Sequence, residues 1–229
     1  MPETILITGG SKGLGRAMVE YWLNDGWNVA TCARDISPLQ ALAQDNADRL
    51  LIAEVDVASH ESVKTFCKNV LDRWSKVDIL INNASILGPR IELDEYFPEE
   101  FDEVLRVNTL GTFNFIHEIV PCMKEQRSGI ILNISSGAGV TGKARWGAYA
   151  ASKFAVEGLT QVLKDELTDH HIRVHAIDPG AMRTQMRAAA YPQEDPMTLP
   201  TPQEVARVIF DIAVVFEPTL TRLKAKDYL

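Results

Sequence analysis

The sequence predicts a protein of the α/β class, with one doubly wound parallel sheet and helices on both of its faces. Three observations predict this fold. Short apolar runs alternate regularly with helical stretches along the chain. The first apolar run leads into a glycine-rich turn that opens a helix. Polar motifs follow successive runs, and ligands of parallel sheets bind beyond the carboxyl ends of the strands.

The elements are expected in alternation. Strands are predicted at residues 4–8, 28–33, 50–55, 78–82, 129–134 and 172–177. Helices are predicted at residues 13–25, 37–45, 59–74, 99–126, 147–169 and 202–214. The strands are apolar throughout, which indicates a parallel sheet buried on both faces. Residues 219–223 could add a short seventh strand.

Length and composition fit a single globular domain over residues 1–229. Hydrophobic residues make up 46% and charged residues 24% of the chain. The net charge of −8 argues against non-specific binding of nucleic acid or of anionic membranes. No apolar run is long enough to span a bilayer, and the first strand begins too early to leave room for a signal peptide.

The cysteines and histidines form no recognisable metal or disulfide pattern. Cys32, Cys67 and Cys122 are odd in number and widely spaced, so we interpret them as reduced thiols of a cytoplasmic protein. The five histidines, none at ligand spacing from the cysteines, are His60, His117, His170, His171 and His175. We therefore predict no metal site.

The glycine-rich turn predicts a dinucleotide site. The apolar strand at 4–8 runs into Gly9-Gly10-Ser11-Lys12-Gly13-Leu14-Gly15, and a helix follows that ends before Gly26. Glycines let the backbone approach a pyrophosphate, and the helix N-terminus supplies N–H donors. The spacing is G-x-x-x-G-x-G and not the general G-x-G-x-x-G, so a glycine turn without a ligand remains the alternative.

The most informative motif is Tyr149-x-x-x-Lys153, preceded by Ser136. Residues four apart on a helix share a face, so the ammonium group of Lys153 would lie beside the phenol of Tyr149. A phenol has a pKa near ~10, and a nearby positive charge lowers it towards a range useful for acid–base catalysis. Ser136 could hold a carbonyl oxygen beside that phenol. Taken alone, such spacing also arises by chance on surface helices.

Together these motifs resemble those of the short-chain dehydrogenase/reductase family. The resemblance implies a Rossmann-like fold and an oxidoreductase that reversibly reduces a ketone or aldehyde to an alcohol. Over about residues 4–185 the matching segments are Thr8-Gly9-x-x-x-Gly13-x-Gly15, Asp56-Val57, Asn82-Asn83-Ala84, Asn108, Ser136, Tyr149-x-x-x-Lys153 and Pro179-Gly180-x-x-x-Thr184. Ser85 replaces a more usual glycine, and Asp178 stands where asparagine is common.

The resemblance also implies which residues bind the cofactor. Asp56 would accept a hydrogen bond from the adenine amino group, although it could instead, or also, cap the helix that begins near residue 59. Asn82 and Ala84 would contribute backbone contacts. The full set is Gly9, Ser11, Lys12, Gly13, Leu14, Gly15, Arg34, Asp56, Val57, Asn82, Ala84, Tyr149, Lys153, Pro179, Gly180, Met182 and Thr184.

The cofactor is expected to be NADP(H) in preference to NAD(H). In the family an NAD-selecting aspartate aligns with Ala33, whereas Arg34 and Lys12 occupy basic positions typical of NADP-binding members. Two cations suit the 2′-phosphate dianion. They could alternatively be solvated surface charges. Asp35, about twenty residues after the glycines, would then point to NAD.

By the same resemblance, Tyr149 donates a proton to the developing alkoxide and Ser136 orients that oxygen. Lys153 binds the nicotinamide ribose and tunes Tyr149, and Asn108 helps hold a water on the proton-relay path. Ser135 is the rival of Ser136, but the thirteen-residue interval to Tyr149 favours Ser136. Asn108 could instead make only a local capping bond or kink its helix.

The substrate is expected to be a small carbonyl compound with apolar groups. Candidate pocket residues, each of which could equally belong to the core, are Ile86, Leu87, Val140, Trp146, Met182, Met186 and Tyr191. Residues 185–201 could act as a lid. The alternative function is a non-catalytic NADP(H)-binding redox-sensing regulator, against which the intact Ser136, Tyr149 and Lys153 argue.

The chain is expected to form a homodimer. The helices near 99–126 and 147–169 correspond to the family's usual four-helix dimer interface. Small residues of the second helix would allow close approach, although they can equally face their own sheet: Ala148, Ala151, Ser152, Ala155 and Gly158. The C-terminus lacks the glycine turn that contributes to tetramers in many members, so a tetramer is less expected.

Overall fold

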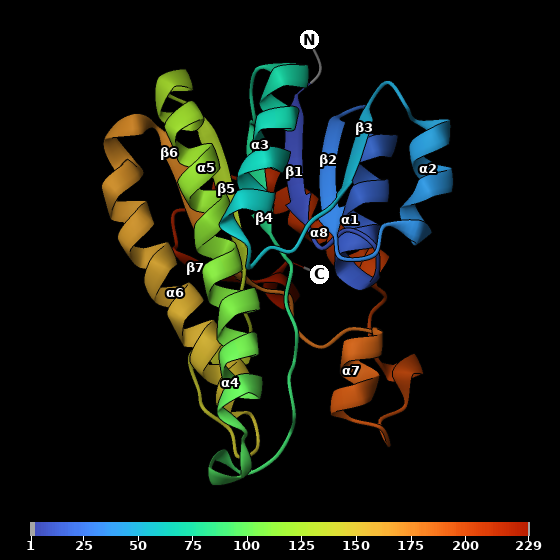
Figure 1. Cartoon of the computed structure of the whole chain (residues 1–229), viewed down its shortest axis with the longest axis vertical. Helices are drawn as coiled ribbons and strands as arrows, with labels where there is room; N and C mark the ends of the chain where they lie inside the picture. Colours follow the sequence, from blue (N-terminus) through green and yellow to red (C-terminus); the bar gives the residue numbers. More distant parts are fainter. Residues whose placement is uncertain (1–2, 229) are drawn as a thin grey trace.

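The computed structural model describes residues 3–228, which contain a sheet of seven parallel strands. The strands are β1 (Thr4–Thr8), β2 (Asn28–Ala33), β3 (Leu50–Glu54), β4 (Ile79–Asn82), β5 (Gly129–Ile134), β6 (Ile172–Asp178) and β7 (Arg222–Lys224). Their order across the sheet is β3-β2-β1-β4-β5-β6-β7. The predicted Rossmann-like α/β fold is confirmed (Figure 1).

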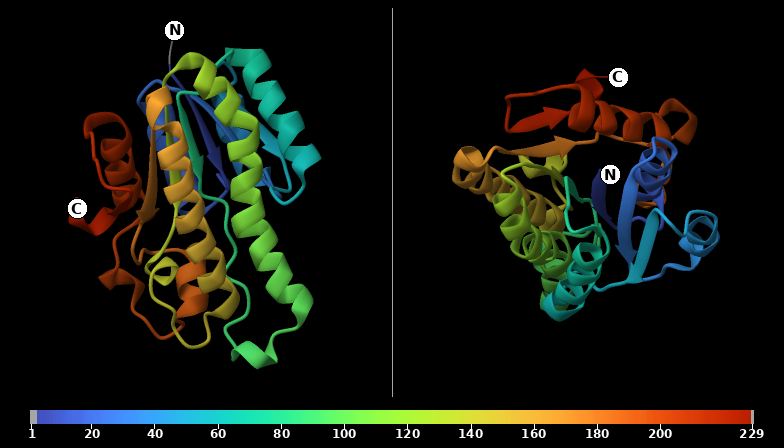
Figure 2. Two further views of the ribbon diagram at one scale, coloured as in Figure 1. Left: turned by 90° about the vertical axis from the view of Figure 1, so that its left-hand side faces the viewer. Right: turned by 90° about the horizontal axis from the view of Figure 1, so that it is seen from above.

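Helices flank both faces of the sheet (Figure 2). They are α1 (Gly13–Asn24), α2 (Gln40–Asp45), α3 (His60–Trp74), α4 (Pro98–Leu105), α5 (Gly111–Gln126), α6 (Gly147–Leu167), α7 (Gln185–Ala190) and α8 (Pro202–Phe210). Ile5 and Ile7 join the core with α1 and α8, whereas Leu6 joins the core with α3, α5 and α6. This alternation follows from the period of two in a strand. Burial on both faces explains why the strands are apolar throughout.

The topology fixes the place of the ligand site. From β1 the chain builds outward to β2 and β3, and then returns to place β4 on the other side of β1. Loops leaving β1 and β4 therefore diverge and open a crevice at the carboxyl edge of the sheet. Figure 1 shows α7 lying beyond this edge.

Several boundaries differ from those predicted. The helix expected at 99–126 is α4 and α5 joined by a π-helical turn at Arg106–Leu110, and α8 continues into a second π-helical turn at Asp211–Val215. The seventh strand forms at Arg222–Lys224, overlapping the end of the predicted 219–223, so the chain has the terminal strand although it lacks the glycine turn. α7 was not predicted as a helix; the Thr184 side chain caps it by accepting from the Arg187 N–H.

Among residues 3–228, no helix combines the length and the apolar character needed to cross a membrane.

Candidate active site

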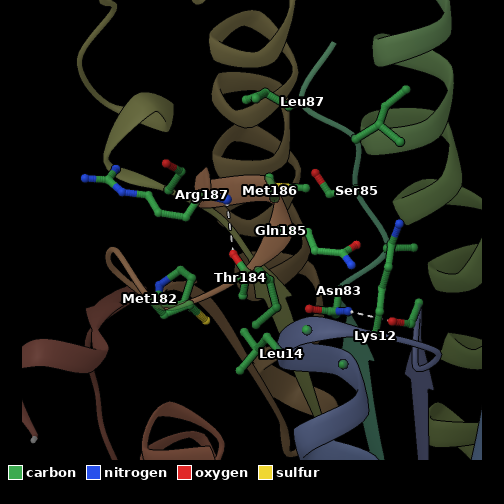
Figure 3. Close-up of a pocket in the computed structure, with 18 of the residues that line it drawn as sticks. Lys12, Leu14, Asn83, Ser85, Leu87, Met182, Thr184, Gln185, Met186 and Arg187 are labelled. Carbon is green, nitrogen blue, oxygen red and sulfur yellow. Dashed lines mark hydrogen bonds between the residues drawn. The ribbon is translucent and has the colours of Figure 1, made fainter. Parts of the chain in front are cut away.

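One cavity of about 1460 Å³ lies along the carboxyl edge of the sheet. Loops that follow β1 to β6 line it. Figure 3 shows Lys12 and Leu14 on one wall and Thr184, Gln185 and Met186 on another. Of the residues predicted to bind cofactor or catalyse, all line this cavity except Asn82 and Asn108. The structure therefore brings together motifs that are spread over most of the chain.

The glycine turn has the shape that a pyrophosphate requires. Gly13 has a φ of 56°, in the left-handed region that favours glycine. A Cβ at Gly15 would lie 2.2 Å from the Gly9 carbonyl oxygen, so the turn can close only around glycine. Leu14 and Gly15 form the first turn of α1, whose free N–H groups point into the crevice. The residues present therefore fit a bound dinucleotide.

Two side chains of the matching motifs, to which the sequence analysis assigned no role, hold this turn against the end of β4. The Thr8 hydroxyl accepts hydrogen bonds from the backbone N–H groups of Asn83 and Ala84, both at 2.9 Å. The Asn83 side chain donates to the Thr8 carbonyl oxygen at 2.9 Å. Asn82, which was expected to contribute backbone contacts, instead lies outside the cavity wall, and its side chain donates to Asn133 at 2.8 Å.

After β1 and β2, two cationic side chains lie on the cavity wall beside a carboxylate that is hydrogen-bonded to its own turn. Lys12 and Arg34 both line the cavity, and Arg34 is 64% exposed with only Glu103 nearby, at 3.7 Å. The Asp35 carboxylate accepts from the Ser37 N–H at 2.9 Å, and this bonding to Ser37 lowers the pKa of Asp35. Asp35 is therefore engaged in its own turn.

Asp56 and Val57 follow β3 and line the cavity as expected. The suggested capping role of Asp56 is wrong, because Ser59 is the N-cap of α3 and its side chain accepts from the Ser62 N–H. Asp56 accepts from the Ala58 N–H at 3.0 Å, a local turn that leaves its other carboxylate oxygen without an assigned bond within residues 3–228.

Tyr149 and Ser136 meet where β5 and α6 approach each other. Tyr149 is buried near the start of α6, and Ser136 follows the end of β5. The neighbouring Ser135 donates its hydroxyl to Glu157 at 2.5 Å and is fully engaged inside the protein. The Ser136 hydroxyl accepts from the Ala138 N–H at 3.2 Å and lies within hydrogen-bonding reach of Tyr149 at the cavity wall, where it can donate to a ligand oxygen. This arrangement favours Ser136 over Ser135.

The expected lowering of the Tyr149 pKa by Lys153 is not what the structure shows. Burial raises the pKa of Tyr149 to about 12, while hydrogen bonding with Ser136 acts in the opposite direction. Lys153 donates to the Ile134 carbonyl oxygen at 2.8 Å, and its nitrogen lies 5.6 Å from the centre of the Tyr149 ring. Burial lowers the pKa of Lys153 to about 8, so a fraction of the lysine is uncharged near neutral pH.

Asn108 lies behind the site, within the π-helical turn between α4 and α5. Its side chain exchanges two hydrogen bonds with the Ile86 backbone, at 2.8 and 2.9 Å, and donates to the Ser152 hydroxyl at 2.9 Å. The π-helical turn displaces the helix register locally, a feature that often marks functional sites. In this structure Asn108 braces the segment after β4 against α6, the helix that carries Tyr149 and Lys153.

A buried ionic cluster supports the other side of the site, and sequence reasoning missed it. Arg222 of β7 donates to Glu157 at 2.9 Å, to Asp178 at 3.0 Å and to the Ser136 carbonyl oxygen at 3.0 Å. This contact accounts for aspartate at position 178, where asparagine is common, because the carboxylate pairs with Arg222. The signal was present in the sequence only as an unusual aspartate and a charged residue in the last strand.

Comparison with known proteins agrees with this geometry. A family model for short chain dehydrogenases matches residues 3–195. The chain belongs to the short-chain dehydrogenase/reductase family. As a member, it is an oxidoreductase that acts on CH–OH or C=O groups.

Individual relatives span most of the chain. An NADPH-dependent pterin aldehyde reductase from Arabidopsis thaliana is 34% identical over 191 residues, which are 82% of this chain and 78% of that protein. A short chain dehydrogenase from Salmonella enterica serovar Typhi superposes with a TM-score of 0.92 at 31% identity, over 99% of this chain and 96% of that one. A Shigella flexneri protein described as a short chain dehydrogenase, complexed with NADP, gives a TM-score of 0.87 at 30% identity, over 98% and 97% of the two chains.

The end of the cavity beside Tyr149 in this dehydrogenase/reductase is aromatic. Trp146 lies 5.6 Å from Tyr149 and 6.0 Å from Tyr191, measured between ring centres. Six of the seven predicted pocket residues line the cavity, but Val140 does not and is 50% exposed. Val140 directly follows the 3₁₀ turn at Gly137–Gly139.

The cysteines and one histidine cluster are the remaining titratable groups of note, and of these only Cys32 lines the cavity. Cys32, Cys67 and Cys122 are unpaired, and burial raises the pKa of each thiol, that of Cys32 to about 12. The structure brings His60 of α3 within 2.6 Å of Glu118 of α5, with His117 beside them, a cluster that sequence spacing did not predict. A direct hydrogen bond between His60 and Glu118 accounts for this contact.

Proposed function

We propose that the protein is an NADPH-dependent oxidoreductase that reversibly reduces a ketone or aldehyde to an alcohol, with Tyr149 as the acid or base. The observation that carries this proposal is the convergence of Ser136, Tyr149 and Lys153 on the cavity whose other end is the glycine turn. The family supplies the reaction class, and the side chains present supply each role that the reaction needs.

The fit to a nicotinamide dinucleotide follows from the cradle already described. Gly9 to Gly15 and the start of α1 would hold the pyrophosphate, and Pro179 to Thr184 would border the nicotinamide. When bound, NADPH supplies the hydride. Every other requirement, namely orientation, a proton and exclusion of water, falls to the protein.

The proton chemistry is assigned to this chain's own groups. Tyr149 is protonated at neutral pH, since burial raises its pKa, so it can donate its phenolic proton to an oxygen that gains negative charge. Ser136 donates a hydrogen bond to the same oxygen and fixes its position. Lys153 restores charge balance behind Tyr149, and Asn108 keeps α6 in place.

The preference for NADP(H) is proposed on the free cations and the engaged carboxylate. Arg34 and Lys12 can reach a 2′-phosphate from the cavity wall, whereas Asp35 is bonded to Ser37. The Arabidopsis and Shigella relatives, which are described with NADPH and NADP, agree with this preference.

A steady-state screen tests the function. Purified protein is incubated with NADPH and with ketones, aldehydes and quinones, and loss of absorbance at 340 nm is followed. Turnover of any carbonyl, abolished in Tyr149→Phe, supports the enzyme. Tight NADPH binding without turnover of any compound would instead favour the redox-sensing regulator.

We also propose a homodimer, formed through α5 and α6, which lie side by side in Figures 1 and 2. Large apolar side chains are exposed on this surface: Leu110, Phe113, Phe154 and Val162. Between the two apolar residues of α6, Gly158 has open space around it and allows close approach. Of the small residues named from sequence, Ala148 and Ser152 are buried within the chain itself.

Light scattering tests the assembly. The 25.4 kDa chain should give twice its mass at micromolar concentration. Phe154→Glu places a charge on the proposed interface and should give the single-chain mass, whereas Glu125→Gln on the exposed end of α5 should leave the dimer intact. A monomeric parent chain would contradict the proposal.

A further inference from the structure

Three cations gather around Trp146 and Tyr191 at one end of the cavity; Lys143 and Arg187 line the cavity, whereas Arg90 lies outside its wall. Arg90 comes from the segment after β4, Lys143 from the loop between β5 and α6, and Arg187 from α7. All three lie against the ring of Tyr191, at 5.0, 5.1 and 3.9 Å from its centre. Arg90 also lies 5.0 Å from the centre of the Trp146 ring. In a chain with a net charge of −8, this concentration of positive charge is local and needs an explanation.

Two of these cations have no carboxylate partner. Arg187 is neutralised by Glu194 through two contacts of 2.6 Å, and the nearby Arg145 pairs with Glu92 at 3.5 Å. Within residues 3–228, neither Lys143 nor Arg90 has an acidic group within 4.0 Å. The substrate end therefore carries an excess of about two positive charges.

The same place holds two donors without acceptors. Arg90 Nε and Trp146 Nε1 are both buried, and neither has a hydrogen-bond partner in the part of the chain that the structure describes. Another nitrogen of Arg90, Nη1, donates to the Ala190 carbonyl oxygen, and Nε makes no hydrogen bond. Buried donors without partners are rare in native proteins, because each costs the free energy of its lost hydration. Trp146 lines the cavity, so an acceptor supplied by a ligand there would satisfy its Nε1.

The ionisation of the Tyr191 phenol shows which charge this environment favours. Lys143 donates to its oxygen at 2.8 Å. This hydrogen bond, together with the charges of Lys143, Arg187 and Arg90, lowers the pKa of Tyr191. The site thus stabilises negative charge on an oxygen attached to an aromatic ring.

We propose that the substrate is an aromatic or similarly planar carbonyl compound that carries a carboxylate at the end remote from the reacting carbonyl. The planar body packs against Trp146, which lies next to Tyr149, and the carboxylate binds Lys143, the unpaired cation that lines the cavity, while Arg90 adds positive charge against the Trp146 and Tyr191 rings. This assignment rests on the proposed function, because it defines the substrate of that same site. It extends the expectation of a merely apolar substrate.

The cofactor does not account for these cations. Lys12 and Arg34 already serve the phosphate-bearing adenine end, and Trp146 lies beside the catalytic Tyr149. Arg187, the cation on the segment that follows the nicotinamide border at Thr184, is the one that has its own carboxylate. The two unpaired cations are those that face Trp146 and Tyr191.

Matched probes test the proposal. 4-Carboxybenzaldehyde carries the carboxylate, methyl 4-formylbenzoate has the same shape without the charge, and their reduction by NADPH is compared as a ratio of kcat/KM. We expect the acid to exceed the ester at least tenfold, since one charge-assisted hydrogen bond contributes on the order of tenfold or more. This advantage should fall as salt concentration rises.

A binding measurement gives a result even without turnover. The affinities of 4-(hydroxymethyl)benzoate and its methyl ester for the protein saturated with NADPH are measured by calorimetry, because the alcohol and the reduced cofactor cannot react together. Tighter binding of the acid supports the proposal, and equal or weaker binding overturns it. Absence of turnover with every carbonyl tested would count against the proposed function. The binding of the acid relative to the ester would still test the carboxylate site.

Variants identify the residues responsible. Lys143→Gln should reduce the acid-to-ester ratio about tenfold, whereas Lys64→Gln, an exposed lysine of α3 outside the cavity, should leave it unchanged. Tyr191→Phe removes the hydroxyl to which Lys143 donates and frees the ammonium group. If Lys143 binds the carboxylate, Tyr191→Phe should keep or raise the ratio. If Tyr191→Phe lowered the acid-to-ester ratio as much as Lys143→Gln does, Lys143 would act only by holding Tyr191 and the end of α7 in place. That result would overturn its assigned role.

Discussion

The two ends of the cavity are built in different ways. The nucleotide end consists of backbone, with the glycine turn after β1 pinned by Thr8 and Asn83 to the end of β4. The substrate end consists of side chains from separate loops, with Trp146 and Tyr191 in contact and cations around them. Backbone geometry leaves a recognisable spacing of glycines in the sequence, whereas side chains that meet across loops leave none.

The difference also concerns charge. At the nucleotide end, Arg34 is exposed and its ion pair with Glu103, at 3.7 Å, lies in solvent, where a phosphate can replace the carboxylate. At the substrate end, cations lie on aromatic faces, where part of their hydration is lost and their attraction for an anion is stronger. The first end suits a cofactor shared by a family, and the second suits one class of substrate.

The largest expected effect is at the junction of the two ends. Tyr149→Phe removes the proton donor and should slow turnover by on the order of 10²–10⁴ while NADPH affinity stays within about threefold of the parent. Steady-state kinetics and fluorescence titration with NADPH measure the two quantities. Tyr21→Phe, a matched change in α1 outside the cavity, should retain full turnover. Near-normal turnover by Tyr149→Phe would remove Tyr149 from the mechanism.

The contrast between the two ends explains which features could be predicted from the sequence and which could not. The fold, the glycine turn and the trio of Ser136, Tyr149 and Lys153 follow from periodicity and spacing, which are local. The role of Arg222 could not be predicted, because its three partners come from the segment after β5, from α6 and from β6, and meet only in the folded sheet. The cluster around Tyr191 was missed for the same reason.

The direction of the Tyr149 pKa was wrong for a related reason. Helical spacing places Lys153 beside Tyr149, but it does not tell how deeply the two are buried. Burial opposes the charged form of each group, so it raises the pKa of the phenol and lowers that of the ammonium group. Depth of burial is a property of the whole packed structure.

The second expected effect concerns stability and tests the ionic cluster of Arg222, Glu157 and Asp178. Arg222→Met leaves the carboxylates of Glu157 and Asp178 without their cation, and Glu157 is 7% exposed. Removing one partner of a buried ionic cluster should lower the free energy of unfolding by on the order of 3 kcal/mol. Urea denaturation measures it. Lys68→Met, which breaks an exposed pair with Asp72, should change it by less than about 1 kcal/mol. Equal losses of unfolding free energy in the two variants would show that the Arg222 cluster stabilises the fold no more than an exposed ion pair does.

The third effect isolates the nucleotide end. Arg34→Ala should weaken NADPH binding by roughly 10- to 100-fold, because a charge-assisted contact to the 2′-phosphate is lost. NADH lacks that phosphate, so its dissociation constant should change by less than about threefold. Arg73→Ala, at the exposed end of α3, is the matched control and should affect neither. A parent chain that binds NADH more tightly than NADPH would point to Asp35 as the selecting residue.

The smallest effect returns to the junction, and its sign follows from the pKa of Lys153. Below about pH 8 the lysine is protonated in both the native and the unfolded states, and burial of the charge costs stability. Above about pH 8 the native state releases the proton, whereas the unfolded state keeps it up to its ordinary pKa of 10.5. The unfolded state then binds more protons, so stability should rise with pH, by roughly 1 kcal/mol between pH 7.5 and pH 9. Chemical denaturation across this range measures the trend in the parent and in Lys153→Met, which has no group to titrate and should lack this contribution. Parallel curves for the two proteins would mean that Lys153 does not titrate in this range, and that its ammonium group persists behind Tyr149 at the higher pH.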